Sequence, residues 1–142
     1  MITNERQYQI SKAEAAKFRA AVEAPDTKAR LLHPRAQQAL RDAAQSQLDD
    51  LLAEIAEYER LREGKLKTIT AESIVDLAPA LVKARIMRKW TQKELADRLA
   101  VAEQQIQRYE ATQYKGVTVE RLQAVADALK LRVQEVITFE PL

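Results

Sequence analysis

The chain has 142 residues and a formal net charge of +2, a length that allows one ordinary domain plus an extension. Its 46% hydrophobic residues, with only two Gly and four Pro, exclude disordered and fibrous proteins and favour a folded, nearly all-helical one. The absence of Cys excludes disulfides, and the polar residues 1–10 and the lack of a long apolar run predict neither signal peptide nor membrane span. We therefore expect a soluble, cytoplasmic protein.

Residues 1–64 are predicted to form a helical extension that begins with a short helix. Ser11 and Glu14 have the spacing of a capping box, in which each side chain bonds a backbone amide of the other residue. This box predicts a helix over residues 11–24, which Pro25 should end.

A long amphipathic helix is predicted over residues 35–63, between Pro34 in its first turn and Gly64 at its end. Its apolar residues recur at spacings of three and four, so the helix must pack on something. Three partners fit: the helix of residues 11–24 in a helical hairpin, the same helix of a second subunit in a coiled coil, or another protein. The residues assigned to this dimer or partner contact are Leu48, Leu51, Ile55 and Tyr58.

A linker over residues 65–78 should lead to a second domain over residues 79–138. Pro79 suits the first turn of its first helix, where a missing backbone amide is harmless. The inward residues of that helix are Leu81, Ala84 and Ile86 or Met87, and its basic stripe consists of Lys83, Arg85, Arg88 and Lys89.

Two short helices joined by a tight turn are predicted between Thr91 and Glu110. Thr91 and Glu94 form a capping box, so the first of these helices begins at Gln92. Its apolar face consists of Leu95, Ala96 and Leu99, and Ala100 and Val101 make the turn. In the next helix Ile106 and Tyr109 point inward, which leaves Glu103, Gln104, Gln105, Gln107 and Arg108 outward.

This pattern is a helix-turn-helix, and its outward side chains suit the major groove of DNA. Gln bonds adenine, Arg bonds guanine and Glu accepts from cytosine, whereas Lys mainly finds phosphates. The alternative is a merely solvated helix face, since Gln and Arg are good helix formers. The capped helix upstream and the tight turn favour DNA.

The domain should be completed by a helix capped by Thr118 and by a last short turn around residues 133–137, giving five helices. The loop between the outward-facing helix and Thr118 contains Tyr114 and Lys115, a phenol and an ammonium that suit phosphate. An ordinary turn explains the same residues.

Residues from Ala80 to Ile137 resemble the Xre family, the Cro/C1-type helix-turn-helix fold of phage repressors and of many antitoxins. The residues that match are Gln92 after Thr91, Glu94, Leu95, Ala96, Leu99, Val101, Ile106 and Glu110. The resemblance implies a five-helix, lambda-repressor-like domain, a phosphate contact for Gln92, and base contacts for Glu103, Gln104 and Arg108, with Gln105 and Gln107 beside them. The full set of predicted DNA-binding residues is Thr91, Gln92, Lys93, Glu103, Gln104, Gln105, Gln107, Arg108, Tyr114 and Lys115.

Two residues depart from the family pattern. Ala100 stands where the family has Gly at the turn, and Ala102 stands where Ser or Thr caps the recognition helix. An alanine at positive φ and a missing cap each cost about 1 kcal/mol. Both departures lower local stability without changing the assignment.

Charge is unevenly distributed along the chain. Residues 83–115 hold eight basic and four acidic residues, whereas residues 42–63 hold seven acidic and two basic ones. The first excess favours phosphates and predicts that DNA binding weakens with salt. The second predicts a separate, basic partner for the long helix.

Catalytic and metal sites are not expected. His33 is the single histidine and lies before Pro34 in a loop, and the carboxylates Glu54, Glu57 and Glu59 come without a phosphate loop or a nucleophile elbow. We therefore predict no enzyme, no metal and no cofactor.

The function predicted from these patterns is a sequence-specific repressor that binds operator DNA as a homodimer. The helical extension resembles those of antitoxins, so the leading hypothesis is the autoregulating antitoxin of a type II toxin-antitoxin module, with a cognate toxin as partner. One alternative is a stand-alone Xre-type regulator whose extension only dimerises, and another is an interaction scaffold that no longer binds DNA.

Overall fold

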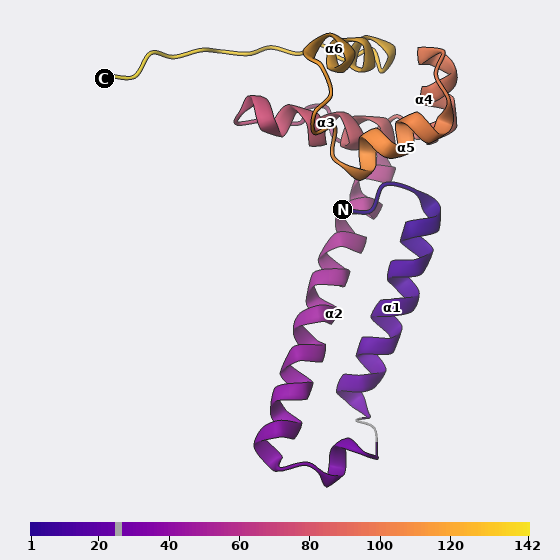
Figure 1. The fold of residues 1–142 in the computed structure, drawn as a ribbon, viewed down its shortest axis with the longest axis vertical. Coiled ribbons are helices and arrows are strands. Elements are labelled where there is room, and N and C mark those ends of the chain that lie inside the picture. Colours follow the sequence, from indigo (N-terminus) through magenta and orange to yellow (C-terminus); the bar gives the residue numbers. More distant parts are fainter. Residues whose placement is uncertain (25–26) are drawn as a thin grey trace. The chain divides into compact units, whose positions relative to one another are not determined.

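A computed structural model gives the fold and describes residues 1–24 and 27–142. These divide into two compact units, Met1–Lys65 and Leu66–Leu142, and all their regular elements are helices (Figure 1). The elements are α1 (Glu5–Glu23), the short 3₁₀ helix η1 (Ala29–Leu31), α2 (Pro34–Glu63), α3 (Ile74–Met87), α4 (Gln92–Leu99), α5 (Glu103–Ala111) and α6 (Val119–Ala128). The predicted all-α class is confirmed.

Helix α1 begins earlier than predicted. Asn4 is the N-cap, and its side-chain oxygen accepts a hydrogen bond from the Gln7 amide at 2.9 Å. The predicted start at Ser11 is wrong, because the residues between Glu5 and Ile10 favour helix and Asn4 caps as well as Ser. The predicted stop at Pro25 lies outside the described residues.

Helix α2 has the bounds that its flanking residues predict. Pro34 is its first residue, and Nδ1 of His33 accepts a hydrogen bond from the Arg35 amide at 3.1 Å. Gly64 ends the helix at φ 68°, in the left-handed region that glycine adopts without a steric penalty. His33 is therefore a helix cap.

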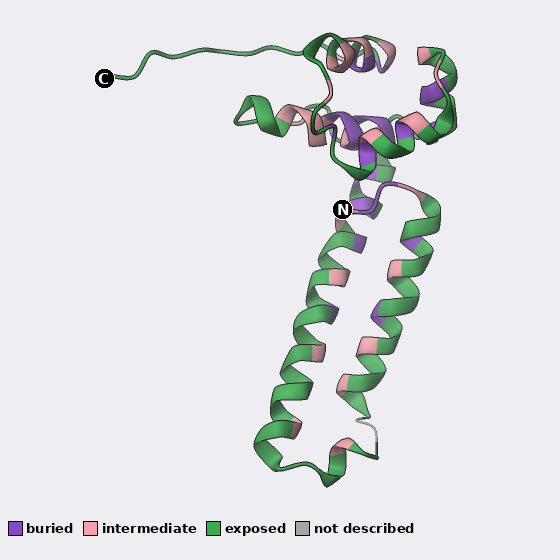
Figure 2. Ribbon diagram, in the orientation of Figure 1, coloured by how far each residue is buried: buried purple, intermediate pink, exposed green. Residues whose placement is uncertain are grey.

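Helices α1 and α2 pack against each other as a hairpin whose buried residues face inward (Figure 2). Leu48, Ile55 and Tyr58 are 6%, 8% and 6% exposed, and the Tyr8 ring of α1 lies 5.2 Å from that of Tyr58. The Tyr8 hydroxyl also donates to Glu59 at 2.5 Å. Among the three predicted partners, the structure shows the intramolecular hairpin.

The assignment of the long-helix seam to a dimer or partner contact is corrected accordingly. Leu48, Ile55 and Tyr58 are already buried within the hairpin, and Leu51 is half-buried. Apolar residues near the loop end of the hairpin remain exposed, with Leu31 at 88% and Leu40 at 53%.

Helix α3 also begins earlier than predicted, so the linker is shorter than residues 65–78. The Ser73 hydroxyl accepts from the Asp76 amide at 3.3 Å and donates to the Asp76 carboxylate at 2.6 Å. Pro79 therefore lies inside the helix. The backbone carbonyl that it deprives of a partner belongs to Val75 in the exposed first turn, where water can donate instead.

The core of the second unit is formed by side chains from all four of its helices. Leu81, Leu95, Ile106, Val125 and Leu129 are each at most 1% exposed. Helix α4 packs on α5 and α6, and α6 packs on α3. This enclosure holds the two helices of the turn motif at a fixed angle.

The predicted fifth helix around residues 133–137 is not formed. Helix α6 ends at Ala128, and residues 131–142 carry no regular structure (Figure 1). Val133, Val136 and Ile137 are β-branched, which disfavours helix, and they are 41%, 91% and 85% exposed. This segment therefore has no packed face that would stabilise a helix.

Candidate nucleic-acid interface

The start of α4 is fixed by the predicted capping box. The Glu94 amide donates to the Thr91 hydroxyl at 3.1 Å, and the Thr91 amide donates to the Glu94 carboxylate at 2.6 Å. The backbone hydrogen bond from Thr91 lowers the pKa of Glu94 below its ordinary value of 4.5. The first helix of the motif thus begins at Gln92, as predicted.

The turn between α4 and α5 contains the two residues that depart from the family pattern, Ala100 and Ala102. Ala100 adopts φ 54°, in the left-handed region, and the Val101 amide donates to the Ala96 carbonyl at 3.0 Å. Ala102 is the N-cap of α5 and provides no side-chain hydrogen bond. Both positions cost stability that Gly and Ser would recover.

A buried ionic network fixes α5 against its neighbours. The guanidinium of Arg85 donates to both carboxylate oxygens of Glu110, at 2.6 and 2.7 Å, and these residues are 3% and 1% exposed. The Gln92 side-chain amide donates to the same carboxylate at 2.8 Å, and Arg85 also donates to the Trp90 carbonyl at 2.6 Å. The network joins α3, the start of α4 and the end of α5.

Two predictions are corrected by this network. Arg85 is not part of a basic surface stripe, and Gln92, at 7% exposed, has its amide directed to Glu110 instead of outward. The sequence carries a signal for Arg85, because this arginine stands between Leu81 and Ile86 in an apolar stretch. A charge in such a stretch requires a buried partner.

The outer face of α5 remains open. Exposed side chains on it are Glu103, Gln104, Gln107 and Arg108, and Gln105 is half-buried. Gln107 donates to the Glu103 carboxylate at 3.3 Å. On the opposite face Ile106 is 0% exposed and Glu110 is 1% exposed. The helix thus presents amide, carboxylate and guanidinium groups from a rigidly held backbone.

The remaining predicted site residues divide between surface and core. Lys93 and Lys115 are exposed, and Lys93 pairs with Asp97 at 3.0 Å, which raises the pKa of this lysine. Tyr114 is 2% exposed and adopts φ 58°, and its ring lies 5.6 Å from that of Tyr109. The predicted phosphate contact of Tyr114 is therefore wrong, because its ring is buried beside that of Tyr109, and burial raises the pKa of its phenol.

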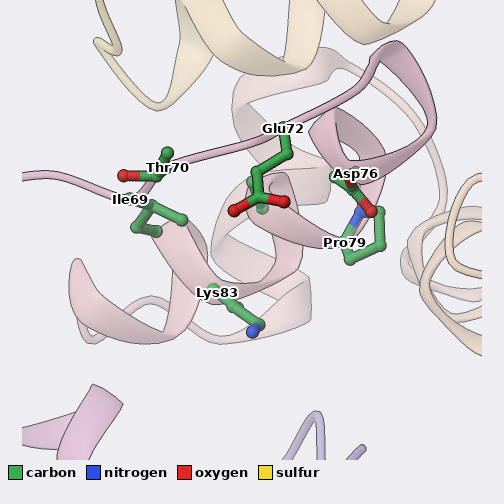
Figure 3. A pocket seen from close by; sticks show the side chains of 7 residues that line it. Ile69, Thr70, Glu72, Asp76, Pro79 and Lys83 are labelled. Carbon is green, nitrogen blue, oxygen red and sulfur yellow. The ribbon is translucent and has the colours of Figure 1, made fainter.

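A pocket of about 300 Å³ lies beside the first turns of α3, and none of the predicted DNA-binding residues lines it (Figure 3). Its lining residues are Ile69, Thr70, Glu72, Asp76, Pro79, Ala80 and Lys83. Over the part of the chain that the structure describes, no three metal-binding side chains cluster, and no helix has the length and hydropathy of a membrane span.

Comparison with known protein families finds one match, and it covers the turn motif. Residues 81–136 match the family model described as helix-turn-helix, from the middle of α3 to beyond the end of α6. No curated protein and no solved structure matches the chain significantly. This match supports an Xre-like, Cro/C1-type helix-turn-helix DNA-binding domain in the second unit. This is a regulatory domain and not an enzyme family, and it supports a DNA-binding transcription regulator.

Proposed function

We propose that the protein is a sequence-specific transcriptional repressor that reads operator DNA with the outer face of α5. The observation that carries this proposal is the contrast between the two sides of the helix. Gln104, Gln107 and Arg108 are exposed, whereas Ile106 and Glu110 are at most 1% exposed. A helix anchored in this way can enter a major groove without disturbing its own packing.

Phosphate contacts are proposed for residues at the rim of this face. Thr91 and Lys93 lie at the start of α4, and Lys115 lies in the loop after α5, all on the surface. Side chains and backbone amides at such places commonly position a helix-turn-helix on the duplex. For Gln92, the bond to Glu110 leaves a positioning role, since it ties the start of α4 to the reading helix.

Binding-site selection with the full chain, followed by titration of the selected duplex, tests the proposal. Arg108→Ala and Gln104→Ala should each weaken binding by about 1–3 kcal/mol and relax preference at particular base pairs. Lys115→Ala should weaken binding to all DNA sequences alike and reduce the salt dependence of binding. A selected site that both α5 variants bind as tightly as the unchanged protein contradicts the assigned face.

We further propose that the hairpin of α1 and α2 binds a toxin, so that the protein is the autoregulating antitoxin of a toxin-antitoxin pair. The hairpin is a compact unit outside the helix-turn-helix match, with its own core. Its outer face exposes acids such as Asp49 and Asp50, and its loop end exposes Leu31. The exposed acids suit a partner with a basic surface, and the exposed Leu31 suits an apolar patch on the same partner.

Co-expression with the product of the neighbouring gene separates this role from DNA binding. The full chain should restore the growth of cells that express this product, and the double variant Asp49→Lys, Asp50→Lys should fail to do so. The variant Arg108→Ala should restore growth but no longer repress the promoter. If the neighbouring product is harmless and does not co-purify, the antitoxin role is rejected. The stand-alone regulator then remains, although its hairpin seam is already closed within one chain.

A further inference from the structure

The loop end of the hairpin, which we define as residues 28–42, exposes apolar side chains. Leu31, Leu32 and Leu40 are 88%, 43% and 53% exposed, and most of the ribbon around the loop has the colour of exposed residues in Figure 2. Apolar residues gathered in one exposed segment often mark an interaction surface. The hairpin seam does not use these leucines, so they are available to another molecule.

Hydrogen bonds hold this loop against the start of α2. The Leu31 amide donates to the Lys28 carbonyl at 3.2 Å, which closes the turn of η1. The side-chain amide of Gln37, in the first turns of α2, donates to the carbonyls of Leu32 and Arg30 at 2.8 and 3.4 Å. The exposed leucines therefore belong to a loop whose backbone is tied to the helix.

Charge is separated along the length of the hairpin. Residues 17–42, around the loop, hold six basic and three acidic residues, whereas residues 1–16 and 43–65, at the other end, hold five basic and eight acidic ones. The two ends therefore carry net charges of +3 and −3. An anionic surface attracts the first end and repels the second. The basic residues of the loop end are all exposed, and they are Lys28, Arg30, Arg35 and Arg41.

We propose that the loop end binds an anionic lipid surface end-on, with Leu31 and Leu32 among the headgroups and the arginines on lipid phosphates. Each Lys or Arg near such a surface strengthens binding about 5-fold, and each apolar side chain that leaves water adds to this. Nucleic acid would bind the arginines but leave the leucines in water. A second copy of the loop end would repel the first by its own charge. A lipid surface satisfies both kinds of side chain.

This binding is separate from operator recognition and from the acids assigned to a toxin. Asp49 and Asp50 lie outside the basic segment of residues 17–42, and α5 belongs to the other unit. Leu31 is the residue that the toxin contact and the lipid contact would share. Withdrawal of a regulator from DNA to a membrane would be the consequence, and that consequence rests on the proposed function, whereas lipid binding itself does not.

Co-sedimentation of the full chain with vesicles, in the absence of DNA, tests the proposal. Phosphatidylglycerol vesicles should bind the protein, neutral phosphatidylcholine vesicles should bind it far more weakly, and added salt should release it. Arg30→Gln with Arg35→Gln should weaken binding about 30-fold, because two charges are lost at about 5-fold each. Leu31→Ala should weaken it on the order of 10-fold.

Matched controls separate the loop end from the total charge. Arg6→Gln with Arg60→Gln removes two exposed charges from the opposite end of the hairpin, and Ile10→Ala shortens an apolar side chain that is 50% exposed there. Arg35 and Arg60 are roughly 37 Å apart along α2 at about 1.5 Å per residue, well beyond a Debye length of about 10 Å. Both controls should therefore leave vesicle binding within about 2-fold of the unchanged chain.

A fluorescent label reports which part of the chain enters the lipid. The sequence has no Cys, so one introduced Cys can carry an environment-sensitive fluorophore. On anionic vesicles the emission of a label at Leu31→Cys should shift to shorter wavelength, whereas labels at Asp50→Cys on α2 and Gln104→Cys on α5 should not shift. A shift at position 104 without one at position 31 would show that the other unit binds the vesicles, and it would overturn the proposal.

Three further results overturn the proposal. The first is a full chain that does not bind anionic vesicles, and the second is binding that tolerates every change at the loop end. The third is a pair of arginine substitutions that weakens binding to the selected duplex but leaves vesicle binding unchanged, which would make the loop end a nucleic-acid contact. Vesicle binding is measured without DNA, so its failure leaves the proposed operator recognition untouched.

Discussion

The hairpin and the helix-turn-helix unit are both built from helices, yet their helices are packed in different ways. In the hairpin, α1 and α2 share one seam, and its buried residues such as Ile55 and Tyr58 retain 8% and 6% exposure. In the other unit, four helices enclose Leu95 and Ile106, which are 0% exposed. Two helices packed side by side leave the edges of their seam open to water, whereas the four helices of the other unit close the core on all sides.

This difference shows what each architecture can hold rigid. The enclosed bundle buries a charge network of Arg85, Gln92 and Glu110, whereas Arg62 and Glu5 of the hairpin form an exposed ion pair at 3.0 Å. Exposed pairs contribute little to stability, but a buried pair becomes costly when one partner is removed. Helix α5 is therefore held by a buried charge network.

Breaking the buried network should give the largest effect. Glu110→Ala removes the carboxylate that pairs with the buried Arg85 guanidinium, so it should lower the free energy of unfolding of the second unit by about 3–5 kcal/mol. Trp90, the single tryptophan of the chain, lies in this unit and reports its unfolding in urea by fluorescence.

Two variants control this experiment. Glu103→Gln, at an exposed position of the same helix, should change stability by less than about 0.5 kcal/mol. Arg85→Met combined with Glu110→Leu removes both charges and should recover part of the loss, because the Gln92 amide and the Trp90 carbonyl still lose their hydrogen bonds to this pair. A Glu110→Ala protein as stable as the unchanged one would show that the network does not hold α5.

The two cores can be compared directly with one substitution in each. Ile106→Ala should cost near the upper end of about 2–5 kcal/mol, because its enclosed site cannot collapse. Ile55→Ala should fall near the lower end, since the open edge of the hairpin seam can relax or admit water. Amide hydrogen exchange of α5 and α2 measures each unit separately. Equal losses would contradict the difference in enclosure.

Repairing the turn of the motif should have a smaller, stabilising effect. Ala100→Gly removes the steric penalty of the left-handed conformation, and Ala102→Ser supplies the missing cap of α5. Each should raise the free energy of unfolding by about 1 kcal/mol, again followed by Trp90 fluorescence. Ala124→Ser, inside α6, is the control and should not raise the free energy of unfolding. A loss of stability at either turn position would contradict the described turn.

The capping carboxylate should give the smallest effect, through pH. The pKa of Glu94 is lowered in the folded protein, so its contribution is complete above about pH 4.5 and is lost as the pH falls through the folded value. Glu94→Gln should therefore flatten the decline of stability in that acidic range. Urea titrations between pH 3 and 6, roughly spanning the range in which carboxyl groups titrate, measure it. An unchanged pH profile would exclude this contribution.

How far the sequence predicts the structure depends on the range of the interactions involved. The Thr91 box, the Gly64 stop and the uncapped Ala102 are local, because each depends on residues within one helical turn, and all were predicted. The Arg85–Glu110 pair joins residues 25 positions apart, so the local sequence can indicate a buried charge at Arg85 but not the residue that pairs with it.

Where a prediction failed, either an earlier capping residue or burial of the side chain explains the difference. Asn4 and Ser73 are capping residues that begin α1 and α3 earlier than Ser11 and Pro79 suggest. Tyr114 has a polar hydroxyl, but it lies in the loop after α5 with its ring buried beside that of Tyr109. The exposed face of α5 follows from its helical periodicity, whereas its DNA contacts remain a prediction.

Photo-crosslinking to the selected duplex tests the central claim, that α5 and not the hairpin reads DNA. A benzophenone side chain is placed at Gln104 on α5 in one protein and at Asp50 on α2 in another, both exposed positions. The account predicts a crosslink to a major-groove base from position 104 and none from position 50. A crosslink from position 50 alone would contradict it.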